Sequence, residues 1–249
     1  MRITNDESRM TTDNSQLDAD GYCVVPAVLS AEGVANGIAA WEAVCRDRAA
    51  DDPAILKGED GVVCGARNLL RLWPAAVEFV RGTALQTVLL ELLGPSAGVV
   101  RGLYFDKPPG RGWALLGHKD YNIAVRSHGT LHRFRQRTTK AGAAHVEAPE
   151  ELLRQMLAVR IHLDAMGDDN GPLRVIPGPH LAFEDADEVR SPSVIRCGAG
   201  DALLMRPLLT HASSHCEAGC GRHRRIVHLE CAPSPELPDG YEWRDFVAI

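Results

Sequence analysis

The sequence predicts a mainly β protein of the α+β class, in which a jelly-roll or cupin-like double sheet carries packed helices. Two observations predict this fold. Short apolar segments bounded by Gly and Pro outnumber the segments with helical periodicity along the 249 residues. The helical segments also cluster early in the chain and do not alternate regularly with strands, so a parallel sheet is not expected.

Three segments carry the signals of helices. Ser30 is a suitable N-cap for a first helix over 31–48, where apolar residues recur at helical spacing. Pro74 suits the first position of a second helix, which ends before Gly94. Pro149 opens a short third helix that continues through the next apolar residues.

The remaining apolar segments are expected to be strands. Asn170-Gly171 lies between two of them, and this dipeptide is the strongest short-range hairpin signal in the chain. We therefore expect the segments on either side of it to pair as a hairpin. The predicted strands are 22–26, 99–105, 117–125, 158–166, 172–177, 193–197, 201–206 and 224–232.

Length and composition favour one domain and a small-molecule partner. With 45% hydrophobic residues, the chain can bury one sizeable core, so we expect a single domain over 1–249. Residues 1–17, approximately, are expected to form a disordered extension. The net charge of -6 argues against binding to nucleic acid or to an anionic membrane surface.

Cysteine usage and hydropathy address the compartment. The seven cysteines are odd in number and scattered, which is not typical of a disulfide framework and favours the reducing cytoplasm. The polar N-terminus lacks an apolar signal-peptide region, and no apolar run approaches the length of a membrane span. We therefore expect a cytoplasmic protein without a membrane segment. The sequence does not indicate an oligomeric state.

Two metal-binding residue types lie in the apolar stretch "LLGHKDYNIAV". His118 and Asp120 are two residues apart, so a strand would place both side chains on one face. An imidazole and a carboxylate side by side are two of the three ligands in a 2-His-1-carboxylate site for Fe(II). The alternative is that the two side chains bond to each other or to the surface.

A third ligand would have to come from another strand. His211, at the end of a predicted strand that begins after Gly200-Asp201, is the best candidate because the chain can return there to the barrel mouth. His162, within another predicted strand, and His180, after a Pro-Gly-Pro turn, are its competitors.

An arginine cluster follows His211 and begins the next predicted strand. Arg222, Arg224 and Arg225 each offer a planar, permanently charged group. Near an Fe(II) site, such a group suits a bidentate grip on the distal carboxylate of a metal-bound 2-oxo acid. Alternation along the strand would turn one of Arg224 and Arg225 inward and the other outward.

Five motifs follow one another along the chain: "LYFDKPPG", "GHKDYNIAVR", "DDNGPLRVIPGPH", "GDALLMRPLLTHASS" and "HRRIVHLEC". In this order they resemble the phytanoyl-CoA dioxygenase-like family of Fe(II)/2-oxoglutarate-dependent oxygenases. The resemblance runs over about 104–231, and "DGYCVVPAVLS" resembles the family's opening. It implies a double-stranded β-helix, Fe(II) held by the HxD pair and a distal histidine, and 2-oxoglutarate anchored by an arginine on the next strand.

Carried over by position, the resemblance assigns the site residues. Arg160 stands where an aromatic residue is more usual, Pro179 replaces the serine of "PGSH", and "GHKD" replaces "WHQD". Because Asp120 is present, hydroxylation is favoured over halogenation, which in the family's relatives needs a small residue there. The implied metal ligands are His118, Asp120 and His211, and the implied 2-oxoglutarate contacts are Arg224, Arg160 and Leu103.

A basic segment follows the HxD motif. Residues 121–146 contain no acidic residue, although the whole chain is acidic. We predict a lid loop that attracts an anionic substrate, the alternative being a solvated basic loop that pairs with acidic neighbours. The arginines in question are Arg126, Arg133, Arg135 and Arg137.

A second metal site is weakly suggested by Cys216, Cys220 and His223. Their spacing fits no common zinc motif, so a loop that is rich in Cys and His is the preferred interpretation.

The predicted function is hydroxylation of an unactivated C–H bond in a small anionic substrate. It would use Fe(II), 2-oxoglutarate and molecular oxygen and release succinate and CO2. The alternatives are desaturation or ring closure by the same cofactors, and a cupin-like protein that binds a metal or a small acid without turnover.

Overall fold

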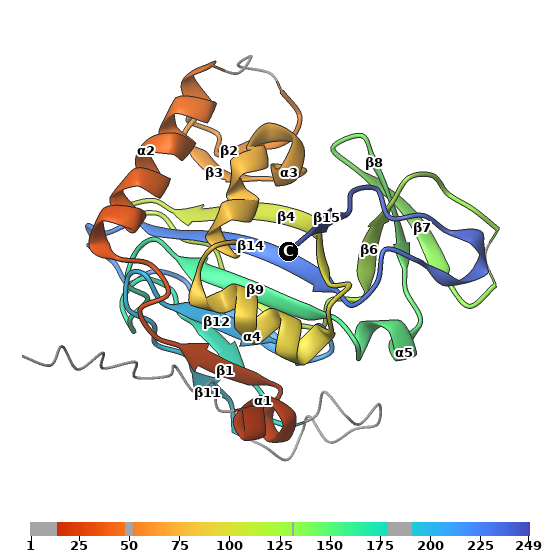
Figure 1. The fold of residues 1–249 in the computed structure, drawn as a ribbon. Helices are drawn as coiled ribbons and strands as arrows, with labels where there is room; N and C mark the ends of the chain where they lie inside the picture. The colour runs from red at the N-terminus through yellow and green to blue at the C-terminus, as the bar shows by residue number, and fades with distance from the viewer. Residues whose placement is uncertain (1–13, 48–51, 131, 179–190) are drawn as a thin grey trace, which may run out of the picture.

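The computed structural model describes residues 14–47, 52–130, 132–178 and 191–249. Within them, the fold is mainly β, with antiparallel sheets and helices packed against one side (Figure 1). The predicted mainly β fold is therefore confirmed. No helix of the described residues is long and apolar enough to cross a membrane.

The largest sheet is the element against which the small sheet and most of the helices pack. It has eight strands in the order β1-β12-β9-β14-β4-β3-β2, with β15 added alongside β4. The long strands β4 and β14 pair antiparallel along nearly their full length (Figure 1). The strands are β1 (Tyr22–Val25), β12 (Ala202–Met205), β9 (Leu157–His162), β14 (Arg224–Ala232), β4 (Gly98–Lys107), β3 (Val63–Ala66), β2 (Ile55–Lys57) and β15 (Val247–Ala248).

A smaller sheet packs against the inner face of the large one. Leu203 and Met205 of the large sheet share an apolar cluster with Leu173 and Val175 of the small one, so the two sheets enclose a common interior. This is the double sheet that the sequence predicted. Its order is β11 (Ser193–Val194), β10 (Leu173–Val175), β13 (His211–Ser213) and β5 (Leu115–His118).

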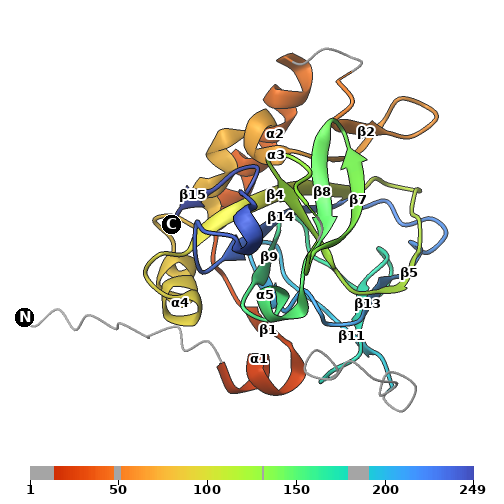
Figure 2. The ribbon, with the colours of Figure 1, turned by 90° about the vertical axis from the view of Figure 1, so that its right-hand side faces the viewer.

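The basic segment is folded as a sheet, contrary to the predicted lid loop. In the order β6-β8-β7, three strands form this third sheet, which stands in front of the large sheet in Figure 2. Phe134 and Val146 are buried in an apolar cluster that also contains Trp243 and Val100 of the large sheet, and this burial orders the segment. The strands are β6 (Asn122–Val125), β7 (Arg135–Lys140) and β8 (Ala143–Glu147).

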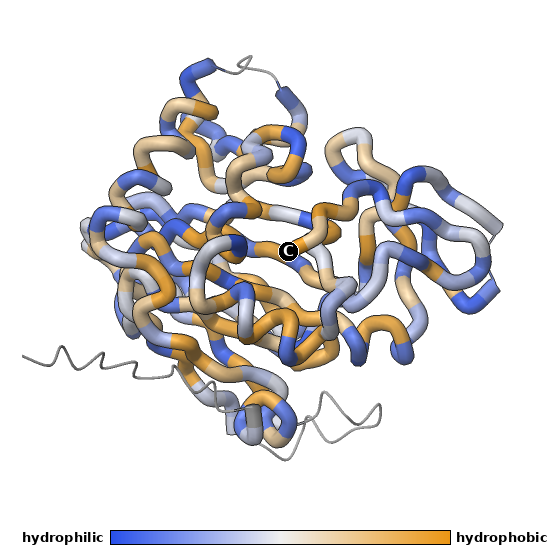
Figure 3. The backbone as a smooth tube through the Cα atoms, viewed as in Figure 1, coloured by the Kyte–Doolittle hydropathy of each residue, from blue (hydrophilic) through white to orange (hydrophobic). Residues whose placement is uncertain are grey.

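Helices cover the outer face of the large sheet. Trp41 of α2 stacks on Tyr104 of β4 with ring centroids 4.2 Å apart. Apolar stretches run along the central strands and along α4 (Figure 3). The helices of the described residues are α1 (Asn14–Asp20), α2 (Ala31–Asp47), α3 (Leu69–Leu72), η1 (Pro74–Phe79) and α4 (Ala84–Leu93), together with α5 (Glu150–Leu153) and η4 (Pro238–Gly240), which contact the basic segment instead.

Some predicted boundaries agree with the structure and some do not. The backbone N–H of Gly33 donates to Ser30 Oγ at 3.1 Å, which confirms the predicted cap of α2. The second predicted helix is interrupted between η1 and α4, and the third ends already at Leu153. Residues 14–17 of the predicted N-terminal extension lie in α1, where Leu17 is fully buried, while 1–13 lie outside the described residues.

The predicted hairpin at Asn170-Gly171 is wrong. Strand β9 pairs with β12 and β14 in the large sheet, whereas β10 pairs with β11 and β13 in the small one. The Asn170 side chain accepts from Gly167 N at 2.9 Å and donates to Ala165 O at 2.7 Å. The dipeptide therefore stabilises a crossing between sheets, which local turn chemistry does not distinguish from a hairpin.

Candidate metal centre

The three predicted metal ligands converge at one edge of the small sheet. His118 ends β5 and lies directly opposite His211, the first residue of β13. Asp120 follows two residues later, and its backbone N–H donates to Pro207 O at 2.9 Å. One ligand atom from each of the three side chains lies within 4.8 Å of the other two. The predicted strand 117–125 is broken here, yet both HxD side chains reach the same point.

Backbone carbonyls fix which ring nitrogen of each histidine is free. His118 Nδ1 lies 2.8 Å from Leu116 O, and His211 Nδ1 lies 2.9 Å from Leu209 O. A carbonyl can only accept, so Nδ1 carries the proton in each neutral ring and Nε2 offers its lone pair. Metal-binding histidines are typically oriented in this way.

The charge states also suit a divalent metal. Burial lowers the pKa of His211 to about 4, so its ring is neutral near pH 7. Burial alone would raise the pKa of Asp120, but the electrostatic effect of the neighbouring basic side chains, His211 first and then His228 and Arg101, outweighs it and holds this pKa below its ordinary value. A neutral imidazole and an ionised carboxylate are the forms that bind metals.

The triad opens into a cavity inside the double sheet. The cavity encloses about 600 Å³, including the space at its mouth. Its floor is formed by inward-facing residues of three neighbouring strands of the large sheet. They are Arg101, Leu103 and Phe105 of β4, Arg160 of β9, and Arg224, His228 and Glu230 of β14.

One end of this interior holds a buried cationic cluster, formed by Lys107, Arg160 and Arg224. These residues are 0%, 7% and 3% exposed, and among the described residues none of them has a carboxylate partner. Lys107 Nζ lies 3.4 Å from both Gly171 O and Ser213 Oγ, and Arg224 Nη1 also donates to Gly171 O. The Nε atoms of both arginines have no hydrogen-bond partner.

The charge balance of the cationic cluster favours an anionic ligand. Burial, followed by the charges of neighbouring arginines, lowers the pKa of Lys107 to about 7. Burial and the charge of Arg160 lower the pKa of Arg224 to about 10. Buried cations of one sign without a counter-charge are costly, so this interior fits an acid such as 2-oxoglutarate.

The alternation along β14 separates the arginine pair as predicted. Arg225 points to the outer face, where its Nε and Nη2 donate to the two carboxylate oxygens of Asp164, each at 2.8 Å. Arg222 lies at the surface and pairs with Asp169. The structure thus brings Arg224, and neither of its neighbours, to the cavity of the triad.

The family profile described as "Phytanoyl-CoA dioxygenase (PhyH)" matches residues 17–224. The chain belongs to this family. As a member, it is a non-haem iron, 2-oxoglutarate-dependent oxygenase. Among curated proteins, no significant sequence match was found.

Solved structures of low sequence identity share the fold. EctD from S. alaskensis with 2-oxoglutarate and 5-hydroxyectoine is 19% identical, with a TM-score of 0.67 over 93% of this chain and 78% of that one. AviO1 from Streptomyces viridochromogenes Tue57 is 20% identical, with a TM-score of 0.63 over 95% and 100%. The non-heme alpha ketoglutarate dependent carbocyclase SnoK from nogalamycin biosynthesis is 18% identical, with a TM-score of 0.61 over 91% and 87%.

His162, one of the two competing histidines, lies outside the group formed by His118, Asp120 and His211. His162 is fully buried, and both of its ring nitrogens lack a hydrogen-bond partner. Burial and the charges of Arg160 and Arg224 lower its pKa to about 3, so the ring is neutral. Among the described residues, the triad is the one group of His, Cys, Asp or Glu that could hold a metal. His180 and Pro179 lie outside the described residues.

The suggested zinc site does not form in the described part of the chain. His223 Nδ1 bonds instead to both carboxylate oxygens of Asp106, each at 3.0 Å. Cys220 Sγ points to Asp169 at 3.8 Å. This agrees with the preferred interpretation of a loop that is rich in Cys and His.

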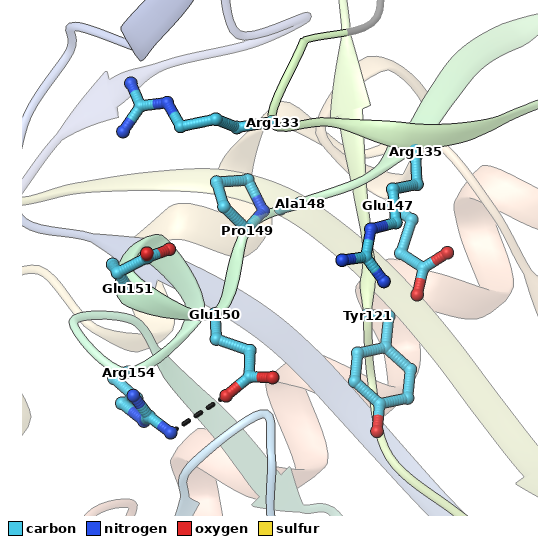
Figure 4. A pocket seen from close by; sticks show the side chains of 9 residues that line it. All are labelled: Tyr121, Arg133, Arg135, Glu147, Ala148, Pro149, Glu150, Glu151 and Arg154. Carbon is cyan, nitrogen blue, oxygen red and sulfur yellow. Dashed lines mark hydrogen bonds and ion pairs between the residues drawn. The ribbon is translucent and has the colours of Figure 1, made fainter. Parts of the chain in front are cut away.

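The arginines of the basic segment lie away from the triad's cavity. Arg126 pairs with Glu242, Arg133 pairs with Asp239 at 3.2 Å, and Arg137 Nη2 donates to Gly129 O at 2.6 Å. Arg133 and Arg135 line a separate, mixed-charge cavity that also contains acidic residues (Figure 4). The other residues that line this cavity include Glu147, Glu150, Glu151, Tyr121 and Arg154. A role of these arginines in substrate binding stays a prediction.

Sequence reasoning missed Lys107. The residue belongs to the quoted motif "LYFDKPPG", yet no role was assigned to it. The signal was present, because strict alternation from Leu103 through Phe105 puts Lys107 on the same inward face. What alternation could not show is that the strand continues to residue 107 and that the smaller sheet covers its end.

Proposed function

We propose that this family member uses Fe(II) and 2-oxoglutarate to hydroxylate an unactivated C–H bond of a small, anionic organic substrate, with release of succinate and CO2. The observation that carries the proposal is the meeting of two features in one cavity. His118, Asp120 and His211 offer three ligands on one side, and Arg160 and Arg224 present uncompensated positive charge inside the same cavity.

Each residue has a defined task in this proposal. His118, Asp120 and His211 would hold Fe(II) through two imidazole nitrogens and one carboxylate. Arg224 grips the distal carboxylate of 2-oxoglutarate through two parallel N–H groups. Lys107 and Arg160 add charge around that carboxylate, while Leu103 packs against the carbon chain.

The iron and 2-oxoglutarate supply the oxidative chemistry when they are bound. The protein supplies position and a dry surrounding. Phe105 packs edge-on against His228 with ring centroids 5.9 Å apart, and Trp113 lies under Lys107 Nζ at 5.6 Å from its ring centre. Both aromatic rings line the cavity at its co-substrate end.

Hydroxylation is favoured over halogenation because Asp120 occupies the carboxylate position. Desaturation and ring closure use the same ligand set, and they remain the alternative outcomes. A cytoplasmic location also stays a prediction. All seven cysteines lie in the described residues, and none of them forms a disulfide there.

The decisive experiment measures succinate. The purified protein is loaded with Fe(II) and 2-oxoglutarate under air, and succinate is quantified with a panel of carboxylic acids, amino acids and acyl thioesters. We expect succinate formation that a subset of substrates stimulates, with a product heavier by one oxygen atom. The His211→Ala variant is the control and should form none. A wild-type protein that binds the metal and 2-oxoglutarate but never forms succinate would instead be a binding protein.

A further inference from the structure

A second group of basic side chains gathers around Arg101, which lines the other end of the cavity. Arg101 belongs to β4, as does Lys107, and six residues of strand place their Cα atoms about 20 Å apart. Arg101 Nη1 donates to Glu230 Oε1 at 2.8 Å and to Asn122 O at 3.2 Å. Its side chain is 12% exposed and lines the cavity of the triad.

A hydrogen bond brings two more cations to this end. Asn68 Nδ2 donates to Ala141 O at 2.9 Å, which ties the end of β3 to the turn after β7. Arg67 and Lys140 are the chain neighbours of the two bonded residues, and both are half-buried. We call Arg67, Arg101 and Lys140 the outer basic cluster.

The outer basic cluster carries excess positive charge. Glu230 pairs with Arg101, while among the described residues no acidic partner is recorded for Arg67 or Lys140. Burial lowers the pKa of Lys140, and the charges of Arg101 and Arg67 lower it further, which together outweigh the opposite effect of Asp120 and Glu230. The pKa of Arg67 is lowered by burial and then by Arg101. Each cation therefore lies within the electrostatic field of the others, which is typical of a site that binds an anion.

The triad shares its cavity with members of both groups of cations, Arg101 of the outer basic cluster and Arg160 and Arg224 of the cationic cluster. Asp120 acts electrostatically on Arg160 of the cationic cluster and on Lys140 of the outer basic cluster. A short dicarboxylic acid such as 2-oxoglutarate cannot span both ends of β4. With its carboxylates at the iron and at Arg224, it leaves the outer basic cluster free for a second anion.

We propose that Arg67, Arg101 and Lys140 bind the carboxylate or phosphate group of the substrate. The inference rests on the proposed function, because it takes the cationic cluster as the co-substrate end. It places the substrate's charge beside the iron, on different residues from Arg133 and Arg135 of the basic segment. Arg101, held by Glu230, provides a rigid donor, and Arg67 and Lys140 close over the anion from the two sides.

The test uses protein loaded with Mn(II) and N-oxalylglycine, an unreactive analogue of 2-oxoglutarate that occupies the co-substrate end. Benzoate and phenyl phosphate are titrated as anionic probes and benzamide as the neutral match, with binding followed by calorimetry. We expect at least one anionic probe to bind and benzamide not to bind. Lys140→Gln and Arg67→Gln should each weaken that binding about tenfold, the size of one charge-assisted hydrogen bond.

Arg46→Gln is the matched control, because Arg46 is an exposed arginine in the last turn of α2. It should leave probe affinity unchanged, and all variants are checked for an unchanged melting temperature. Equal binding of benzamide and the anions, or full probe affinity in both Lys140→Gln and Arg67→Gln, overturns the inference. If N-oxalylglycine itself does not bind, the proposed function fails, and the same titrations without it still decide whether the outer basic cluster binds anions.

Discussion

Arg224 offers the sharpest test of the co-substrate end, because Arg224 and the next residue, Arg225, are of the same type but lie on opposite faces of β14. Replacing Arg224 with Leu removes a buried charge that has no acidic partner among the described residues. Replacing Arg225 with Leu removes a charge that pairs with Asp164 on the outer face. The first change should affect 2-oxoglutarate binding, and the second should affect only stability.

The magnitude follows from the charges that remain. Truncating one partner of a buried, hydrogen-bonded charge pair costs about 2 to 5 kcal/mol. Because Lys107 and Arg160 still face the carboxylate in Arg224→Leu, we expect the lower part of this range, about 2 to 3 kcal/mol. This corresponds to a rise of roughly 30- to 150-fold in the dissociation constant of 2-oxoglutarate. Arg224→Lys should be intermediate, since lysine keeps the charge but loses the bidentate fork.

Two measurements check this expectation. Calorimetry with Mn(II)-loaded protein gives the affinity for N-oxalylglycine, and succinate formation gives the KM for 2-oxoglutarate. Urea unfolding without ligand should show that Arg224→Leu is no less stable than the wild type, whereas Arg225→Leu loses stability. Normal 2-oxoglutarate affinity in Arg224→Leu together with weak affinity in Arg225→Leu would refute the assigned strand faces.

The remaining predictions concern the metal and the basic segment. His211→Ala should lose both iron binding and turnover, whereas His162→Ala should keep iron binding. Metal titration measures this, and the reverse result would make His162 the third ligand. If the basic segment steers an anionic substrate, kcat/KM should fall with rising salt, and charge reversal at Arg133, Arg135 and Arg137 should lower it without affecting iron loading. We expect this charge reversal to lower kcat/KM less than Lys140→Gln does, because Arg133 already pairs with Asp239. An equal or larger loss of kcat/KM would favour the basic segment as the substrate site.

Local signals in the sequence predicted most of the residues that the structure brings together in the candidate site. The i, i+2 spacing of His118 and Asp120 and the alternation that turns Arg224 inward depend only on backbone geometry, and the structure has both. The Ser30 cap is likewise a contact across three residues. Such features are encoded within a single turn or strand, so they can be read without knowing the pairing of strands.

Contacts between residues far apart in the chain account for the features that the sequence did not predict. Asn170-Gly171 has the chemistry of a hairpin turn, but the strands on either side of it belong to different sheets. The outer basic cluster depends on a hydrogen bond between Asn68 and Ala141, which lie 73 residues apart. Nothing in either local sequence marks that contact.

Lys107 links the buried charge of the co-substrate end to protein stability. The folded protein lowers the pKa of Lys107 from 10.5 to about 7. Between these values the unfolded chain keeps the proton while the folded protein has released it. Unfolding therefore takes up a proton, and the stability of the ligand-free protein should rise as pH increases from about 7 towards 10.5.

The slope of this dependence has an upper limit for one proton of about 1.4 kcal/mol per pH unit. Lys107→Met removes the titrating group, so the difference between wild type and variant isolates it from the cysteine thiols that titrate in the same range. Urea unfolding at several pH values between 7 and 9.5 gives both slopes. A bound dicarboxylate holds Lys107 protonated and should flatten the wild-type slope. Identical slopes in wild type and Lys107→Met would mean that Lys107 keeps its ordinary pKa, and the interior would then hold less uncompensated charge than its geometry indicates.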